Sequence, residues 1–179
     1  MARPRDELTA GEWAVLAILA EGPSHGFAVA RALRPDGEVG RIWTVRRPLV
    51  YRAVETLTGL GFVKHAGTVA SPSGPPRAIL QATPKGKRAV TRWLKTPVEH
   101  VRDARSLLML KLLFLDRRGG DPASLLAAQR DRFAALTDGL SGAVDKADGF
   151  DRVLALWRLE TASAALRFVD AMLGEGRRQ

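Results

Sequence analysis

One stretch of the sequence, between positions 42 and 88, constrains the fold of this chain most strongly. Residues 48–60 begin with a proline, carry apolar side chains at helical spacing and are followed by a glycine. Two strand-like runs come next, 62–66 and 77–82, and a segment rich in Ser, Pro and Gly separates them. Thr83 then caps another helix. A helix, a two-stranded hairpin and a second helix in this order predict a winged helix-turn-helix.

Two helices are expected before this stretch. Thr9 and Glu12 have the spacing of a capping box, which predicts a helix that begins near residue 9 and runs to Ala20. Ser24 is a suitable N-cap for the next helix, which should end before Pro35. Because a two-stranded wing is only marginally stable alone, we expect it to pack on these helices.

The second half of the sequence predicts only helices. Segment 104–116 is apolar on nearly all sides, whereas the last segment, 151–173, and the segment between them each have one apolar stripe. Three such helices bury little apolar surface by themselves, so we expect them to pack against a second copy of the chain. The predicted class is a mainly helical protein with a small two-stranded wing, divided into a winged helix-turn-helix domain, 7–96, and a three-helix C-terminal dimerisation domain, 97–174.

The positive charge lies in the half that carries the winged-helix pattern. The net charge is +9; residues 1–95 hold 15 Lys and Arg against 7 Asp and Glu, whereas residues 96–179 hold 13 against 12. A general preference for arginine would raise both halves, so the asymmetry favours a surface that binds a polyanion. Double-stranded DNA is therefore the expected partner of the first domain.

Several classes of protein receive little support from the sequence. The chain has no cysteine, and its three histidines lack the spacing of metal ligands, so no metal or other cofactor is expected. No nucleophile elbow, Gly-rich phosphate loop or pair of catalytic carboxylates is present, which argues against an enzyme. Neither a signal peptide nor an apolar run long enough to cross a membrane is found, so we expect a cytoplasmic protein without a membrane partner.

Several short motifs share their order and spacing with one known family. They are His25-Gly26-Phe27, Val50-Tyr51-Arg52-Ala53-Val54, Gly61-Phe62-Val63, Thr83-Pro84-Lys85-Gly86, Trp93-Leu94 and Leu107-Leu108-Met109-Leu110-Lys111-Leu112. With them the chain resembles the PadR-type transcriptional regulators over about residues 7–173. The resemblance implies a non-catalytic DNA-binding repressor, often released by a small ligand, whose helical C-terminal domain forms a homodimer. Arg46-Arg47-Pro48 and the wing segment 76–80 depart from the usual family pattern.

The helix over residues 48–60 is the expected reading helix, because the major groove of DNA is wide enough for a helix. Arg52 is the first choice for a base contact, since a guanidinium can pair with both acceptors of guanine. Arg46 and Arg47, just before the helix, are assigned to phosphates, with base contact as an alternative. Tyr51 either donates to a phosphate or is a half-buried core residue.

Four further cations are expected to contact the DNA backbone. Lys64 and Arg77 belong to the predicted wing, although Lys64 is equally well explained as a solvated strand residue. Lys85 and Lys87 lie near the start of the next helix, where backbone N–H groups also favour phosphate.

The second half also suggests a site for an effector. Met109, Trp157 and Phe168 are expected near the dimer seam, and they would suit a flat, apolar or aromatic small molecule; ordinary core packing is the simpler alternative. The sequence thus predicts a homodimeric, ligand-responsive repressor that binds a near-palindromic operator. The rival hypothesis is a winged-helix adaptor for other proteins, in which the basic surface only aids solubility.

Overall fold

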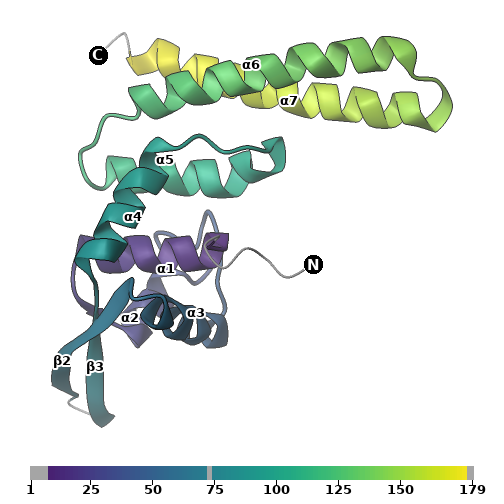
Figure 1. Ribbon diagram of the computed structural model, residues 1–179. Coiled ribbons are helices and arrows are strands. Elements are labelled where there is room, and N and C mark those ends of the chain that lie inside the picture. Colours follow the sequence, from purple (N-terminus) through teal and green to yellow (C-terminus); the bar gives the residue numbers. More distant parts are fainter. Residues whose placement is uncertain (1–7, 72–73, 177–179) are drawn as a thin grey trace.

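The computed structural model describes residues 8–71 and 74–176 and has two parts, a winged-helix unit and a long helical hairpin (Figure 1). In chain order the elements are α1 (Ala10–Glu21), β1 (Ser24–His25), α2 (Gly26–Ala32), α3 (Arg47–Gly59), β2 (Val63–Ser71), β3 (Gly74–Ala82), α4 (Pro84–Lys95), a 3-10 turn η1 (Val101–Asp103), a π-helical turn η2 (Ala104–Leu108), α5 (Met109–Asp116), α6 (Ala123–Lys146) and α7 (Gly149–Gly176). The predicted class, mainly helical with a small wing, is confirmed.

Helix α1 forms the centre of the first core. The Thr9 hydroxyl accepts a hydrogen bond from the backbone N–H of Glu12 at 3.1 Å, and the Glu12 carboxylate accepts one from the backbone N–H of Thr9 at 2.6 Å, so the predicted capping box is present. Most of the helix is buried, because α2, α3, α4 and β3 all pack around it. The winged-helix unit is therefore built around one nearly apolar helix.

The wing has three strands rather than the two that the sequence predicts. β1 joins the hairpin on the far side of β3, giving the order β1-β3-β2, with Ser24 opposite Leu80 and His25 opposite Ile79. Because Ser24 belongs to this strand, His25 caps α2 in its place: its Nδ1 accepts a hydrogen bond from the backbone N–H of Ala28 at 3.0 Å. This pairing attaches the start of α2 directly to the wing.

Helix α5 lies between the two parts of the chain. Its Leu110 and Phe114 side chains belong to the core of the winged-helix unit, whereas Leu108, just before it, packs with α6 and α7. A boundary near residue 96 remains a prediction, because the segment that follows it contributes to both cores.

A buried lysine lies at this junction. Lys111 is only 3 % exposed, its Nζ donates a hydrogen bond to the carbonyl oxygen of Thr96, and the same atom lies 5.4 Å from the centroid of the Trp93 ring. Trp13 of α1 stacks on Trp93, with ring centroids 4.9 Å apart. Burial lowers the pKa of Lys111 from its ordinary value of 10.5 to about 8, an effect that the carboxylate of Asp103 partly opposes.

We expect Lys111 to make the stability of the chain depend on pH. Between its folded pKa of about 8 and its unfolded pKa of 10.5, the unfolded chain binds the extra proton, so the free energy of unfolding rises with pH through that window. From pH 7 to 9.5 the rise should be about 2 kcal/mol larger in the wild type than in Lys111→Met. Denaturant titrations at a series of pH values measure this; parallel pH profiles of the two proteins would contradict it.

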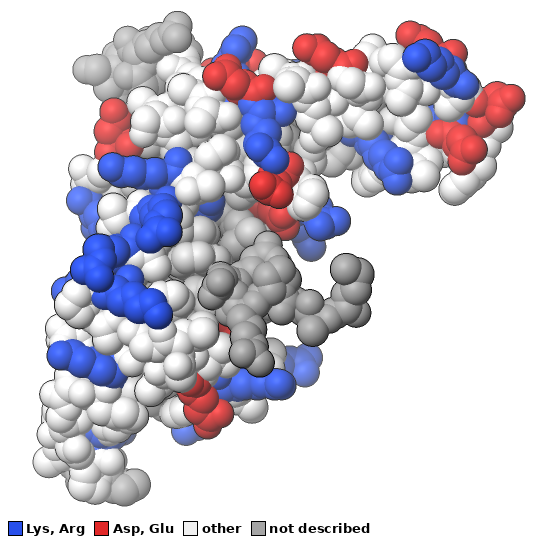
Figure 2. All heavy atoms as spheres, viewed as in Figure 1, with Lys and Arg blue, Asp and Glu red and all other residues white. Residues whose placement is uncertain are grey.

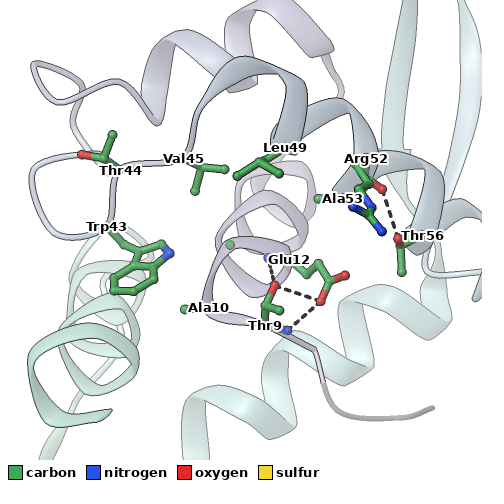
Figure 3. Close-up of a pocket in the computed structure, with 11 residues that line it drawn as sticks. Thr9, Ala10, Glu12, Trp43, Thr44, Val45, Leu49, Arg52, Ala53 and Thr56 are labelled. Atoms are coloured by element: carbon green, nitrogen blue, oxygen red, sulfur yellow. Dashed lines mark hydrogen bonds between the residues drawn. The ribbon is translucent and has the colours of Figure 1, made fainter. Parts of the chain in front are cut away.

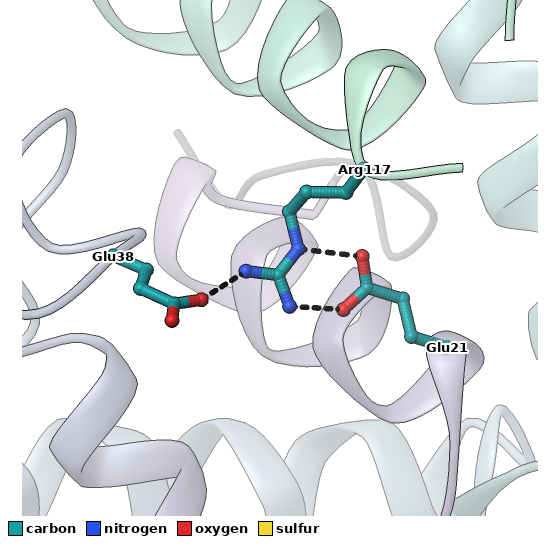
Figure 4. A network of polar contacts seen from close by, with 3 residues as sticks. All are labelled: Glu21, Glu38 and Arg117. Atoms are coloured by element: carbon teal, nitrogen blue, oxygen red, sulfur yellow. Dashed lines mark hydrogen bonds and ion pairs between the residues drawn. The ribbon is translucent and has the colours of Figure 1, made fainter. Parts of the chain in front are cut away.

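An arginine after α5 ties the junction to α1 (Figure 4). The Arg117 guanidinium donates to both carboxylate oxygens of Glu21, at 2.9 and 2.7 Å, and to Glu38 at 2.5 Å. The hydrogen bonds that Arg117 donates to Glu21 raise the pKa of Arg117 above its ordinary range, ahead of the smaller effect of Glu38. The same bridge compensates the unfavourable position of Glu21, an acid in the last turn of a helix.

Arg117→Met is expected to lower the free energy of unfolding by about 1–3 kcal/mol, because it leaves the partly buried Glu21 without its bidentate partner. Arg88→Met is the matched control, since Arg88 is exposed on α4 and forms no ion pair within residues 8–71 and 74–176. This control should shift stability by less than about 0.5 kcal/mol. Chemical denaturation of both variants tests the prediction, and equal losses would refute it.

Helices α6 and α7 form an antiparallel hairpin that extends beyond the rest of the chain (Figure 1). Near the junction its core contains Leu125, Leu126, Phe133 and Val169. Gln129, fully buried there, exchanges two hydrogen bonds with the backbone of Val98 and so fixes the segment after α4. Among the helices of the described residues, none combines the length and apolar character needed to cross a bilayer.

Candidate nucleic-acid interface

Helix α3 presents a polar face away from the core. Val50, Ala53, Val54 and Leu57 are buried against the winged-helix core. The opposite side carries Arg52, which is exposed, together with the exposed residues around it on neighbouring turns. Helical periodicity alone therefore places Arg52 where the sequence predicts it, on the outer face of the predicted reading helix.

Arg52 borders a shallow groove between α3 and the start of α1 (Figure 3). Leu49 and Thr56 continue the α3 side of this groove, and Trp43 lines its far end. The Thr56 hydroxyl donates to the backbone carbonyl of Arg52 at 3.1 Å, so it is satisfied within the helix. The Arg52 guanidinium makes no ion pair within the described parts of the chain and can be directed to a ligand in front of α3.

The first turn of α3 brings two further predicted residues together. Arg47 and Tyr51 are four residues apart on one side of the helix, and the Arg47 Cζ lies 5.7 Å from the centroid of the Tyr51 ring. The Tyr51 ring covers the start of α2, where a Cβ atom on Gly26 would lie only 2.9 Å from Tyr51 Cε1. A side chain at position 26 would therefore require the Tyr51 ring to shift. Arg46 stands at the N-cap of α3, exposed and without a side-chain capping bond.

The sequence analysis missed one residue of this region, Phe27. Extending the register that pairs His25 with Ile79 places position 27 opposite position 77, so the wing brings Arg77 beside the Phe27 ring. The Arg77 Cζ lies 5.4 Å from the ring centroid, and the Arg47 Cζ lies 5.6 Å from it. Phe27 could have been found only from the pairing of β1 with β3. Because β1 is two residues long, it has no periodicity that would reveal this pairing in the sequence.

The remaining predicted cations lie in two different places. Lys64 is exposed on β2, whereas Lys85 and Lys87 are exposed near the start of α4. The Lys85 ammonium donates to the carbonyl oxygen of Leu60 at 2.8 Å and lies 4.8 Å from the Phe62 ring centroid, so it caps α3. A phosphate at Lys85 would have to compete with that bond.

Basic side chains gather over α4, which carries no acidic residue (Figure 2). Lysine and arginine are mixed with acidic residues over the α6–α7 hairpin in the same view. On the face shown in Figure 2, the charge asymmetry of the sequence is thus also seen on the surface.

The three residues of the predicted effector site lie in different surroundings within the described part of the chain. Met109 packs in the second core, whereas Trp157 is 69 % exposed and Phe168 is also exposed, both on α7. Trp157 and Phe168 lie about three helical turns apart on the same face. Within the described residues, no three His, Asp or Glu side chains lie where they could share a metal ion.

Comparison with known proteins gives a family for the first part of the chain. Residues 15–92 match the sequence profile of the transcriptional regulator PadR-like family. No curated protein matches the sequence at a significant level.

Three solved structures match more than nine-tenths of the chain at low sequence identity. PadR of Bacillus subtilis in complex with operator DNA is 19% identical, with 95% of this chain and 99% of that chain covered and a TM-score of 0.49. The protein smu.1604c of Streptococcus mutans UA159 is 15% identical, with 92% and 98% covered and a TM-score of 0.44. The PadR-like transcriptional regulator BC1756 of Bacillus cereus is 16% identical, with 92% and 96% covered and a TM-score of 0.40.

The predicted resemblance is thereby confirmed for the segment that contains α2, α3 and the wing. Residues 15–92 are therefore similar in sequence to the PadR-like family of transcriptional regulators.

Proposed function

We propose that the chain is a sequence-specific DNA-binding regulator that represses transcription as a homodimer on a near-palindromic operator. The observation that carries the proposal is the outer surface of α3 and the wing, where Arg46, Arg47, Arg52, Lys64 and Arg77 are all exposed. None of these five forms an ion pair within residues 8–71 and 74–176, so each is available to a polyanion.

In this proposal α3 enters the major groove and the wing follows the sugar-phosphate backbone. Arg52 reads a base edge, because it stands on the outer face of the helix and forms no ion pair with any of the described residues. Arg46, Lys64 and Lys87 contact phosphates and supply affinity without sequence preference. Tyr51 supports Arg47 through its ring rather than acting as a core residue, since it remains exposed beside α2.

A homodimer is supported by an uncovered apolar stripe on α7. Phe150, Val153, Trp157, Ala164 and Phe168 recur at helical spacing, all are exposed, and they face away from the side that packs on α6. A second copy is the proposed occupant, because the nearly neutral half of the chain lets two such helices approach without net repulsion. The same stripe holds Trp157 and Phe168, so the proposed effector, a small apolar or aromatic molecule, would bind at the seam between copies.

Binding of fluorescent duplexes at several salt concentrations tests the proposal. A regulator should prefer particular duplexes from a mixed set, and its affinity should fall steeply with salt, by about 0.9 logarithmic units per decade for each phosphate contacted. The adaptor hypothesis predicts weak binding without preference among duplexes. If every duplex bound equally weakly, the proposed function would be wrong.

A further inference from the structure

The exposed ring of Phe27 holds two cations that come from different elements. Phe27 lies in the first turn of α2 and is 45 % exposed. The Arg47 and Arg77 guanidinium carbons lie 5.6 and 5.4 Å from its ring centroid, both within the range of cation–π attraction. The predicted reading helix and the wing are therefore joined through one aromatic side chain.

The surroundings of this ring favour an anion. A hollow of about 580 Å³ opens between the wing and the two helices, and Arg47, Arg77, His25, His65 and the Tyr51 side chain all line it. No acidic side chain lines the hollow, and neither arginine forms an ion pair within the described ranges 8–71 and 74–176. Both guanidinium groups lie against the same ring, and because like charges repel, an anion placed between them is favourable.

The chemistry of the two arginines narrows the anion to a phosphate. A guanidinium presents paired N–H donors that match phosphate oxygens, and it remains charged at any physiological pH. A phosphodiester is the phosphate that a protein with an exposed reading helix would meet at this position, because the hollow lies beside the first turn of α3.

We infer that Phe27 is a positioning residue that directs Arg47 and Arg77 onto one and the same phosphate of the DNA backbone. The inference rests on the proposed DNA-binding function. It adds that the two arginines contact one phosphate rather than two, and that the Phe27 ring brings the two arginines together. Helix and wing then hold one strand at a single point, so the wing cannot adjust independently of the reading helix.

The number of phosphates can be counted from the salt dependence of binding. The full-length chain, Arg47→Ala, Arg77→Ala and the double variant are titrated with a preferred and a scrambled duplex from low to high salt. The slope is that of the logarithm of the binding constant against the logarithm of the salt concentration. If the two arginines share one phosphate, the slope of the double variant should be smaller in magnitude by about 0.9 for each protomer. If the two arginines contact two separate phosphates, the slope should be smaller in magnitude by about 1.8 for each protomer, and that result would overturn the inference.

The role of the ring is tested by replacing it. Phe27→Leu keeps an apolar side chain of similar size at an exposed position, and it should weaken binding to both duplexes by the same factor, about fivefold. Phe27→Trp keeps a ring and should bind as tightly as the wild type. Added to the double arginine variant, Phe27→Leu should have no further effect, because the ring acts only through the two arginines.

The outcomes separate this inference from the proposed function. Equal weakening by Phe27→Leu and Phe27→Trp, or a Phe27→Leu effect that persists without the arginines, would show that the ring only supports the fold. If the wild type itself has no preference among duplexes, the proposed function fails instead. Circular dichroism of each variant confirms that the winged-helix unit is folded.

Discussion

Trp157→Asp is expected to convert the protein from a dimer to a monomer and to reduce its affinity for a two-half-site duplex by about 100-fold or more. Trp157 lies at the centre of the uncovered α7 stripe and is 69 % exposed, so an aspartate there is tolerated by the single chain but not by an apolar interface. Affinity falls because the second reading helix is no longer held near its half-site.

Sedimentation velocity and duplex titration measure the two effects separately. Arg158→Asp is the matched control, because it places the same side chain one residue further along α7, off the apolar stripe and on an exposed site. This control should remain a dimer. A Trp157→Asp protein that stays dimeric and binds as tightly as the wild type would show that the two copies meet elsewhere.

Arg52→Ala is expected to remove most of the sequence preference. A lost bidentate contact to guanine costs roughly 1–3 kcal/mol of discrimination in each half-site, or about 2–6 kcal/mol over a symmetric operator. Arg52 is exposed and its backbone stays within α3, so the fold should not change. The measurement is the ratio of dissociation constants for the preferred duplex and for one with the central base of each half-site changed.

Lys87→Ala provides the comparison for Arg52. Lys87 is exposed on α4 and is proposed to contact a phosphate, so its loss should weaken all duplexes by the same factor. If Arg52→Ala instead weakened the preferred and altered duplexes by the same factor, Arg52 would be a phosphate contact and another residue would read the bases.

Local signals explain why much of the fold was predictable. The capping box at Thr9 and Glu12, the threonine cap of α4 at Thr83 and the amphipathic pattern of α3 each depend on residues a few positions apart. Each of these elements begins within about a residue of its predicted start. The apolar character of the second half likewise predicted its helices, although α7 extends further at both ends than the predicted range 151–173.

Long-range contacts explain what the sequence did not reveal. Strand β1 is two residues long and exists only because β3 pairs with it, so neither the third strand nor the meeting of Phe27 with Arg77 has a local signature. Lys111 interrupts an apolar run, yet its burial depends on the Thr96 carbonyl and the Trp93 ring from another helix. The sequence likewise predicts a phosphate contact for Lys85, because Lys85 lies near the start of a helix. Its hydrogen bond to the carbonyl oxygen of Leu60 depends on the packing of α4 against the end of α3, which has no local signature.

Selection of bound fragments from a pool of random duplexes tests the central claim most directly. The proposed homodimer predicts enrichment of an inverted repeat whose half-sites are centred about one helical turn, roughly 34 Å, apart. Enrichment of a single asymmetric half-site, or of no sequence at all, would contradict it.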